Sequence, residues 1–293
     1  MKKVLVVVLS LAMIIGVLAT AGCSSKNSGS SGNEDAILIV SFGTSYNESR
    51  NVTIGAIESA IAEAYPSYDV RRAFTAQTII DILKNREGIA IDNVTEALDR
   101  AVADGVKNLI VQPTHLMDGL EYGDIKEEVE KYTEKFDSIK LAEPLLNSDE
   151  DYDKVMKAIV EDTKEYDDGK TAICYMGHGT TADSNKIYVN MQKKLADAGY
   201  NNYFIGTVEA APTLDDVIAL VKKGDYERVV LLPLMVVAGD HATNDMAGDE
   251  EDTWKTAFKN AGYEVVPVLR GLGQLYPIQQ IYVQHVKDIM ESK

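Results

Sequence analysis

The strongest constraint in the sequence is an internal repeat of apolar segments that end in turn residues. In the first half, the apolar run 36–40 predicts a buried strand, and the segments 70–74 and 108–111 predict a second and a third strand. The second half repeats the order, with runs at 171–176, 203–207 and 228–233. Segments with helical spacing lie between the runs, and strands alternating with helices predict parallel βαβ units. We therefore expect an α/β fold of two similar α/β lobes, each a parallel sheet flanked by helices, with a cleft between them.

The first 22 residues have the layout of a secretory signal peptide. Lys2 and Lys3 precede an apolar stretch, and small residues follow it. The end of the segment resembles a bacterial lipobox, although Thr20 stands where leucine is usual. We expect Cys23 to become a lipidated N-terminus, with ordinary secretion as the alternative. The protein would then be exported, on the extracytoplasmic face of a bacterial membrane or in the periplasm, and would touch the membrane through its lipid anchor only.

The remaining chain divides into three predicted parts. Residues 23–35 form the lipidated cysteine and a flexible polar tether. The N-terminal lobe is expected at 36–145, and the C-terminal lobe, which carries most candidate metal ligands, at 146–293. Cys174 lies inside an apolar run, where a small core residue is expected rather than a nucleophile.

The net charge narrows the range of partners. The formal charge is −17 at pH 7, and phosphate neutralisation needs a basic surface, so no nucleic-acid binding is expected. The acidic runs 149–151 and 249–252 are expected to be solvated. Oligomeric state is left open, including a homo-oligomer.

Three side chains follow predicted strand ends in the second half, where ligands bind in open α/β sheets. These are His178, Glu209 and His241. Two imidazoles and a carboxylate suit Co²⁺, Fe²⁺, Ni²⁺ or Zn²⁺, and a neutral imidazole also accepts protons near neutral pH. The alternative for each histidine is a hydrogen-bonded structural role.

Other candidates are weaker. His115 and Glu121 occupy comparable positions in the first half. His285 lies in a predicted terminal helix at 279–290 and is expected to be structural or exposed. Gly177 and Gly179 flank His178 and would either let a planar ligand approach the backbone or simply allow a tight turn.

Several segments together resemble the sirohydrochlorin cobaltochelatases of the anaerobic pathway, which share the class II chelatase fold with ferrochelatase. The resemblance runs from about residue 36 to 290. It is carried by the segments 38–45, 72–75, 175–179, 206–209, 233–246 and 252–255. Among them, 233–246 (PLMVVAGDHATNDM) is the most specific.

The resemblance implies insertion of Co²⁺ into a metal-free tetrapyrrole such as sirohydrochlorin, as in cobalamin biosynthesis, with Fe²⁺ or Ni²⁺ as alternative metals. It implies metal ligation by His178, Glu209 and His241, with His178, His241 and Glu121 as catalytic residues. The tetrapyrrole pocket is then expected to include Phe42, Gly43, Thr44, His115, Gly177 and Gly179.

Two features of the chain fit this expectation poorly. The substrate carries many carboxylates, so a local positive patch is expected, with Arg71, Arg72 or Lys186 as candidates. Export is unusual for a biosynthetic enzyme. The alternative hypothesis is therefore a non-catalytic periplasmic lipoprotein that binds metal or haem, with His115 as the haem ligand.

Overall fold

The structure is a computed structural model that describes residues 33–292. The predicted signal peptide, Cys23 and most of the tether lie outside the described residues. The described residues belong to one compact unit. Within this part of the chain, every helix is too short or too polar to cross a bilayer.

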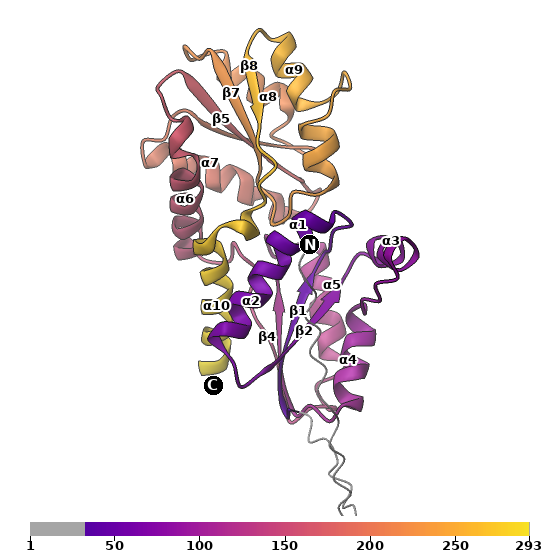
Figure 1. Ribbon diagram of the computed structural model, residues 1–293. Helices are drawn as coiled ribbons and strands as arrows, with labels where there is room; N and C mark the ends of the chain where they lie inside the picture. The colour runs from indigo at the N-terminus through magenta and orange to yellow at the C-terminus, as the bar shows by residue number, and fades with distance from the viewer. Residues whose placement is uncertain (1–32, 293) are drawn as a thin grey trace, which may run out of the picture. The chain divides into compact units, whose positions relative to one another are not determined.

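Two four-stranded parallel sheets form the framework, one in each half of the chain (Figure 1). The N-terminal sheet has the order β2-β1-β3-β4 and consists of β1 (Asp35–Ser41), β2 (Asp69–Phe74), β3 (Asn108–Pro113) and β4 (Ser138–Leu141). The C-terminal sheet has the order β6-β5-β7-β8 and consists of β5 (Thr171–Gly177), β6 (Tyr203–Thr207), β7 (Arg228–Pro233) and β8 (Glu264–Pro267). The identical order confirms the predicted duplicated α/β fold. The edge strands β4 and β8 were not among the predicted strands.

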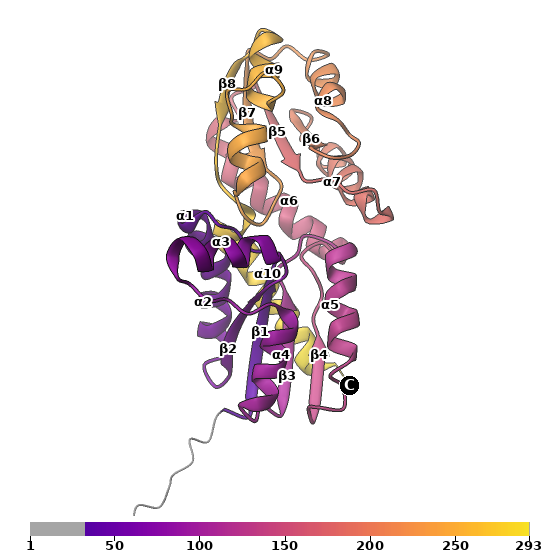
Figure 2. The same ribbon diagram turned by 90° about the vertical axis from the view of Figure 1, so that its right-hand side faces the viewer.

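Helices flank both faces of each sheet, as Figures 1 and 2 show. The helices of the first half are α1 (Asn47–Val52), α2 (Ile54–Ala64), α3 (Gln77–Glu87), α4 (Val94–Ala103) and α5 (Leu120–Glu130). Those of the second half are α6 (Asp149–Thr163), α7 (Lys186–Asp197), α8 (Leu214–Val221), α9 (Trp254–Asn260) and α10 (Tyr276–Glu291). Short 3₁₀ turns lie at Lys164–Tyr166, Asp183–Asn185 and Leu272–Gln274, and a π-helical turn at Ala242–Met246.

Alternation along the central strands explains the layers. In β1, Ile37 and Ile39 pack in the cluster that includes α2 and α10, whereas Leu38 and Val40 pack with α4 and α5. Successive strand residues point to opposite faces, so a strand that is apolar at every position is buried on both. Cys174 is buried on the β5 face that packs with α8 and α9, and burial raises the pKa of its thiol. It is a core residue, as expected.

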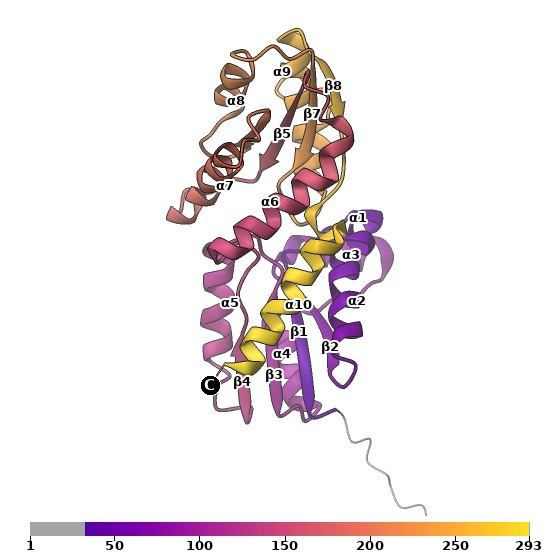
Figure 3. The ribbon, with the colours of Figure 1, turned by 90° about the vertical axis from the view of Figure 1, so that its left-hand side faces the viewer.

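The last helix joins the two halves of the chain. α10 follows the second sheet in sequence but packs against α2 and β3 of the first, and it also contacts α6 (Figure 3). The Tyr282 hydroxyl donates to the carbonyl of Thr114, 2.9 Å away. α10 thus contacts elements of both halves, and the division into lobes at 36–145 and 146–293 stays a prediction.

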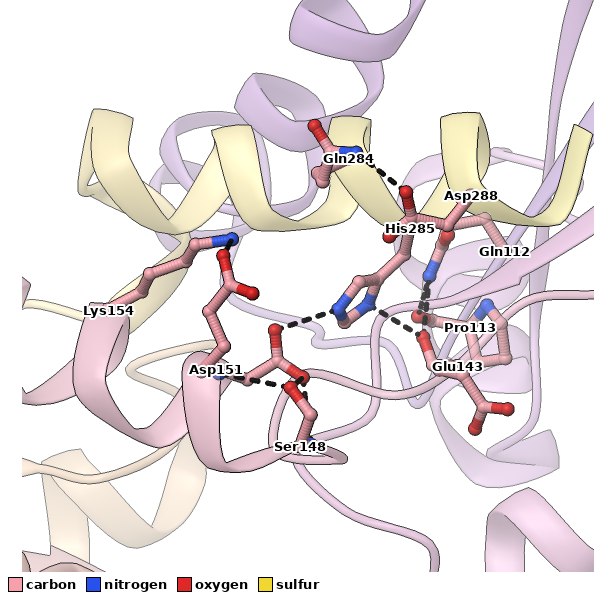
Figure 4. A network of polar contacts seen from close by, with 10 residues as sticks. Gln112, Pro113, Glu143, Ser148, Asp151, Lys154, Gln284, His285 and Asp288 are labelled. Atoms are coloured by element: carbon pink, nitrogen blue, oxygen red, sulfur yellow. Dashed lines mark hydrogen bonds and ion pairs between the residues drawn. The ribbon is translucent and has the colours of Figure 1, made fainter. Parts of the chain in front are cut away.

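A buried pair of side chains fastens α10 to the start of α6 (Figure 4). His285 Nε2 lies 3.1 Å from Asp151 Oδ1, and Nδ1 lies 3.1 Å from the carbonyl of Glu143. Both ring nitrogens therefore lie within hydrogen-bond distance of an oxygen, one on a carboxylate and one on the backbone. Burial opposes ionisation of Asp151, but hydrogen bonds from His285 and Ser148 hold the pKa of its carboxyl below the usual value.

Asp151 therefore corrects the expectation that the acidic run 149–151 is wholly solvated. Its exposed fraction is only 5%. The reason is that it is the third residue of α6, where it forms a capping box with Ser148 and also faces His285 of α10. His285 is structural rather than exposed.

Candidate metal and tetrapyrrole site

A cavity of about 480 Å³ lies at the carboxyl ends of the central strands of both sheets. Its walls come from the segments that follow β1, β3, β5 and β7, at 41–46, 114–117, 178–181 and 235–241. The direction in which successive strands are added to the sheet reverses between β1 and β3 in the first sheet and between β5 and β7 in the second. Ligands bind at such switch points in open α/β sheets. The volume falls in the range of small-molecule sites, about 300–1,000 Å³.

His178 is the first residue after β5. Its Nδ1 lies 2.8 Å from the carbonyl oxygen of Gly179. A carbonyl only accepts, so Nδ1 carries the proton and donates it, which leaves the Nε2 lone pair free. Nε2 lies 3.7 Å from Oε1 of Glu209. His178 is thus presented with its unprotonated nitrogen toward Glu209.

Glu209 is placed by an extension of the sheet pairing beyond β6. Its backbone N–H donates to the His178 carbonyl over 2.9 Å, directly after the bond from Val208 to Gly177. The Thr207 hydroxyl donates to the carbonyl of Ala210 and closes the turn. The Glu209 side chain is about half exposed, so its carboxylate is free to accept a cation.

His241 begins the helical turn that follows β7. The N–H at Nδ1 donates to Oδ2 of Asp245 over 2.6 Å, which again leaves Nε2 as the free nitrogen. The π-helical turn 242–246 follows at once, a feature that occurs frequently at functional sites. Asp245 was not identified from the sequence, and its only signal there is the four-residue spacing from His241.

These three side chains converge. Ligand atoms of His178, Glu209 and His241 lie within 4.8 Å of one another. The two imidazole rings meet edge to face, with centroids 4.7 Å apart and planes at 80°. Ligands about 2.1 Å from a metal lie ~3–3.5 Å apart, and the 3.7 Å between His178 Nε2 and Glu209 Oε1 is close to that spacing. The arrangement can hold one divalent ion at the cavity wall.

The expected pocket glycines divide into two kinds. Gly43 and Gly179 line the cavity and have positive φ angles of 100° and 87°, which other residues rarely adopt. Gly177 is not among the described lining residues. A Cβ there would lie 2.1 Å from the Tyr188 ring, so this glycine is needed for packing. Tyr188 itself lines the cavity and accepts a hydrogen bond from the Gly179 N–H.

His115 and Glu121 line the same cavity from the N-terminal half. Both ring nitrogens of His115 are buried, with no hydrogen-bond partner among the described residues. Burial lowers the pKa of His115 to about 4, opposed by the nearby negative charge of Glu121. The imidazole is therefore neutral near pH 7. Glu121 is exposed in the first turn of α5.

The two halves touch at the edges of the cavity. The Tyr46 hydroxyl donates to Asp240 over 3.2 Å, and a Cβ on Gly239 would lie 3.2 Å from Thr44 Oγ1. On the other side, a Cβ on Gly119 would lie 3.4 Å from Ser184 Oγ. Gly119 and Gly239 are equivalent positions of the repeat, so each half meets the other through the same glycine. Neither Tyr46 nor Asp240 was singled out from the sequence.

The expected positive patch is not found at this site. None of the described residues that line the cavity is a lysine or an arginine. Arg71 is paired with Asp69 and Asp104, and Arg72 with Glu58, because strand β2 places them beside those carboxylates. Lys186 lies at the start of α7 and does not line the cavity.

Two other arginines contact the backbone of the loop that follows β1 and lines the cavity. Arg50 donates to the carbonyl of Thr44 over 3.3 Å, and Arg86 donates to that of Ser45. Both contacts are with backbone atoms of the loop after β1. These cations therefore hold the loop in place rather than face the cavity.

Comparison with known proteins agrees with this geometry. The family described as cobalt chelatase (CbiK) matches residues 35–291. A sirohydrochlorin cobaltochelatase of Salmonella typhimurium is 36% identical over 87% of this chain and 96% of its own. One from Nitratidesulfovibrio vulgaris is 29% identical over 85% of this chain and 88% of its own.

Solved structures show the same fold. SirB from Bacillus subtilis with Fe³⁺ superposes with a TM-score of 0.62 at 15% identity, covering 88% of this chain and 96% of SirB. The sirohydrochlorin chelatase SirB of Bacillus subtilis subspecies spizizenii with cobalt gives 0.59 at 14% identity, covering 88% and 95%. The family match over nearly all of the described residues, together with the Salmonella relative, places this chain in the cobalt chelatase family.

Proposed function

We propose that the protein inserts Co²⁺ into sirohydrochlorin. The observation that carries this proposal is the convergence of His178, Glu209 and His241 on the wall of a cavity between two duplicated sheets. The relatives named sirohydrochlorin cobaltochelatase support the choice of metal and tetrapyrrole. They favour the enzyme over a non-catalytic metal- or haem-binding protein.

The chemistry exchanges one divalent cation for two protons. The two pyrrole N–H protons of the macrocycle leave, and Co²⁺ takes their place, so the total charge is conserved. The Nε2 lone pair of His178 cannot hold the metal and a proton at once. As the metal passes to the macrocycle, Nε2 is released and can accept a pyrrole proton. Because the His178 side chain is 44% exposed, the proton can then pass to water.

Holding the metal and the macrocycle together in the right orientation is a second contribution to the rate enhancement. Phe42 and Leu120 are apolar lining residues with exposed fractions of 50% and 64%. They provide a surface against which a planar macrocycle can lie. Glu121 lines the same wall and can accept the second proton. Orientation of the ring nitrogens toward the metal would convert a bimolecular step into one within the complex.

The test is metal insertion by the purified protein. Incubation with sirohydrochlorin and Co²⁺ should change the absorption spectrum faster than a control without protein. Fe²⁺ and Ni²⁺ are assayed beside Co²⁺, because a ligand set of two imidazoles and one carboxylate accepts all three. Glu209→Gln keeps the size of the side chain and removes its charge, and it serves as the impaired control. A rate equal to the control with every metal would refute the proposal.

We further propose that the protein is an exported lipoprotein anchored through Cys23. The support is the sequence of residues 1–23, with two lysines, an apolar stretch and small residues before the cysteine. Cys23→Ser should move the protein from the membrane fraction to the soluble fraction. Unchanged membrane association of the variant would rule out the anchor.

A further inference from the structure

The two imidazoles of the site differ in the hydrogen-bond acceptor that faces their Nδ1 atom. His178 Nδ1 faces the carbonyl oxygen of its neighbour Gly179, a neutral backbone acceptor. His241 Nδ1 faces the Asp245 carboxylate, which is charged. Both arrangements leave Nε2 unprotonated, but only the second places a negative charge directly behind the ring. Such a carboxylate fixes the ring orientation and makes the imidazole a stronger ligand.

Asp245 lies four residues after His241, a spacing that places two side chains side by side on a helical turn. The turn 242–246, which contains Asp245, is a π-helix that begins directly after His241. Asp245 does not line the cavity, whereas His241 does. Asp245 therefore lies behind the ligand rather than beside the metal position. The side-chain contact of Asp245 is with the His241 ring, whereas its neighbour Asn244 donates to Asp240.

We propose that Asp245 is a positioning residue that makes His241 the fixed ligand of the site and leaves His178 as the exchangeable one. This inference rests on the proposed function. A chelatase must bind its metal and then release it to the macrocycle, so its ligands cannot all be equally strong. The carboxylate behind His241 and the carbonyl behind His178 supply the difference.

The direct test is Co²⁺ binding by the full-length protein without tetrapyrrole. Asp245→Asn keeps the shape of the side chain but allows its amide to donate to Nδ1, which would move the ring proton to Nε2. We expect the variant to bind Co²⁺ about 10–100-fold more weakly. Its Co²⁺ absorption bands should resemble those of His241→Ala, because both lack the same ligand. Asp245→Glu keeps the carboxylate and should restore part of the affinity.

The matched control is Asp249→Asn. Asp249 lies four residues later, pairs with Lys255 and does not line the cavity. The Asp249→Asn substitution removes the same negative charge from a residue that does not contact an imidazole, so the affinity for Co²⁺ should be unchanged. Thermal unfolding of each variant shows whether the fold is retained.

The outcomes separate this inference from the proposed function. Wild-type affinity and bands in a folded Asp245→Asn variant would overturn the role of Asp245, whatever the chelation rate. So would an equal loss of affinity in Asp249→Asn, because it would make the effect one of general charge. If the expected loss is seen but the wild-type protein does not metallate sirohydrochlorin, the role of Asp245 stands and the proposed function fails.

Discussion

The two halves of the molecule use equivalent positions for different chemistry. The first residue after the central strand is Phe42 in one half and His178 in the other. The matching backbone bonds that follow, from Ala76 N–H to the Phe42 carbonyl and from Glu209 N–H to that of His178, make Ala76 the counterpart of Glu209. A third pair of equivalent positions follows the strands β3 and β7, where Glu121 of the first half corresponds to His241 of the second. The duplication therefore gives a cavity in which one wall carries the candidate metal ligands (the metal-binding wall of our proposal) and the other is largely apolar.

This difference teaches how a repeat can acquire function. Both halves keep the turn glycines Gly43 and Gly179, because each has a positive φ angle. The side chains beside those turns are free to differ, since they point into the cavity and carry little of the packing. The backbone of the turn is thus constrained in both halves of the molecule. The candidate metal ligands are needed in only one half.

The largest expected effect comes from the metal-binding wall. His178→Ala and His241→Ala should each lower the chelation rate ~10²–10⁴-fold, the usual contribution of a positioned base. The double variant should be little worse than either single one, because groups that act as a unit are not additive. Steady-state rates with Co²⁺ and sirohydrochlorin measure this. A folded single variant that kept most of its activity would show that the asymmetry between the walls is not functional.

The next effect concerns a contact outside the repeat, between Asp151 and His285. Asp151→Asn breaks a buried hydrogen-bonded pair by removing the charge of one partner and should lower the free energy of unfolding by ~3–5 kcal/mol. Chemical denaturation measures this, and activity at low temperature should be kept. The Asp151 pKa is lowered on folding from 3.8, so the unfolded chain takes up the proton first. The contribution is therefore complete above pH 3.8 and is lost as the pH falls through the folded value.

An unfolding free energy unchanged by Asp151→Asn would mean that the pair does not fasten α10 to α6. The same measurement on Asp249→Asn serves as the control, because that carboxylate is exposed.

A smaller effect is expected on the apolar wall. Phe42→Ala removes a half-exposed ring, and full burial of such a side chain is worth ~1.5–3 kcal/mol. The KM for sirohydrochlorin should therefore rise about tenfold, while Co²⁺ affinity stays constant. Ile82→Ala on α3, 41% exposed and not lining the cavity, is the control. Loss of Co²⁺ affinity in Phe42→Ala would contradict the division between the walls.

The smallest effect is that of salt. The described lining residues include three acids, Glu121, Glu209 and Asp240, and no lysine or arginine. Added salt should therefore weaken Co²⁺ capture and ease the approach of the carboxylate-rich substrate, each by a few-fold. Initial rates at several ionic strengths measure both KM values. A KM for sirohydrochlorin that rises with salt would indicate an attractive basic surface near the cavity.

Much of the fold could be read from the sequence because its signals are local. The apolar runs predicted the four central strands, β1, β3, β5 and β7, since a strand buried on both faces is apolar for most of its length, and the edge strands β2 and β6 were predicted beside them. β4 and β8 were missed, because these edge strands are four residues long and only partly buried. The α10 helix was predicted, but not its place on the N-terminal sheet, which depends on contacts with residues such as Thr114, far earlier in the chain.

The sequence by itself determined the duplicated α/β order and the positions of His178, Glu209 and His241 at strand ends, because parallel strands bring their carboxyl ends to one edge. Only the tertiary structure decided how each side chain is used. It decided that Asp245 contacts His241, that the ring of Tyr188 requires a glycine at 177, and that Arg71 and Arg72 pair with neighbouring carboxylates. These outcomes depend on side-chain direction, and those of Gly177 and Arg72 also on residues of other helices, which the local strand pattern does not encode.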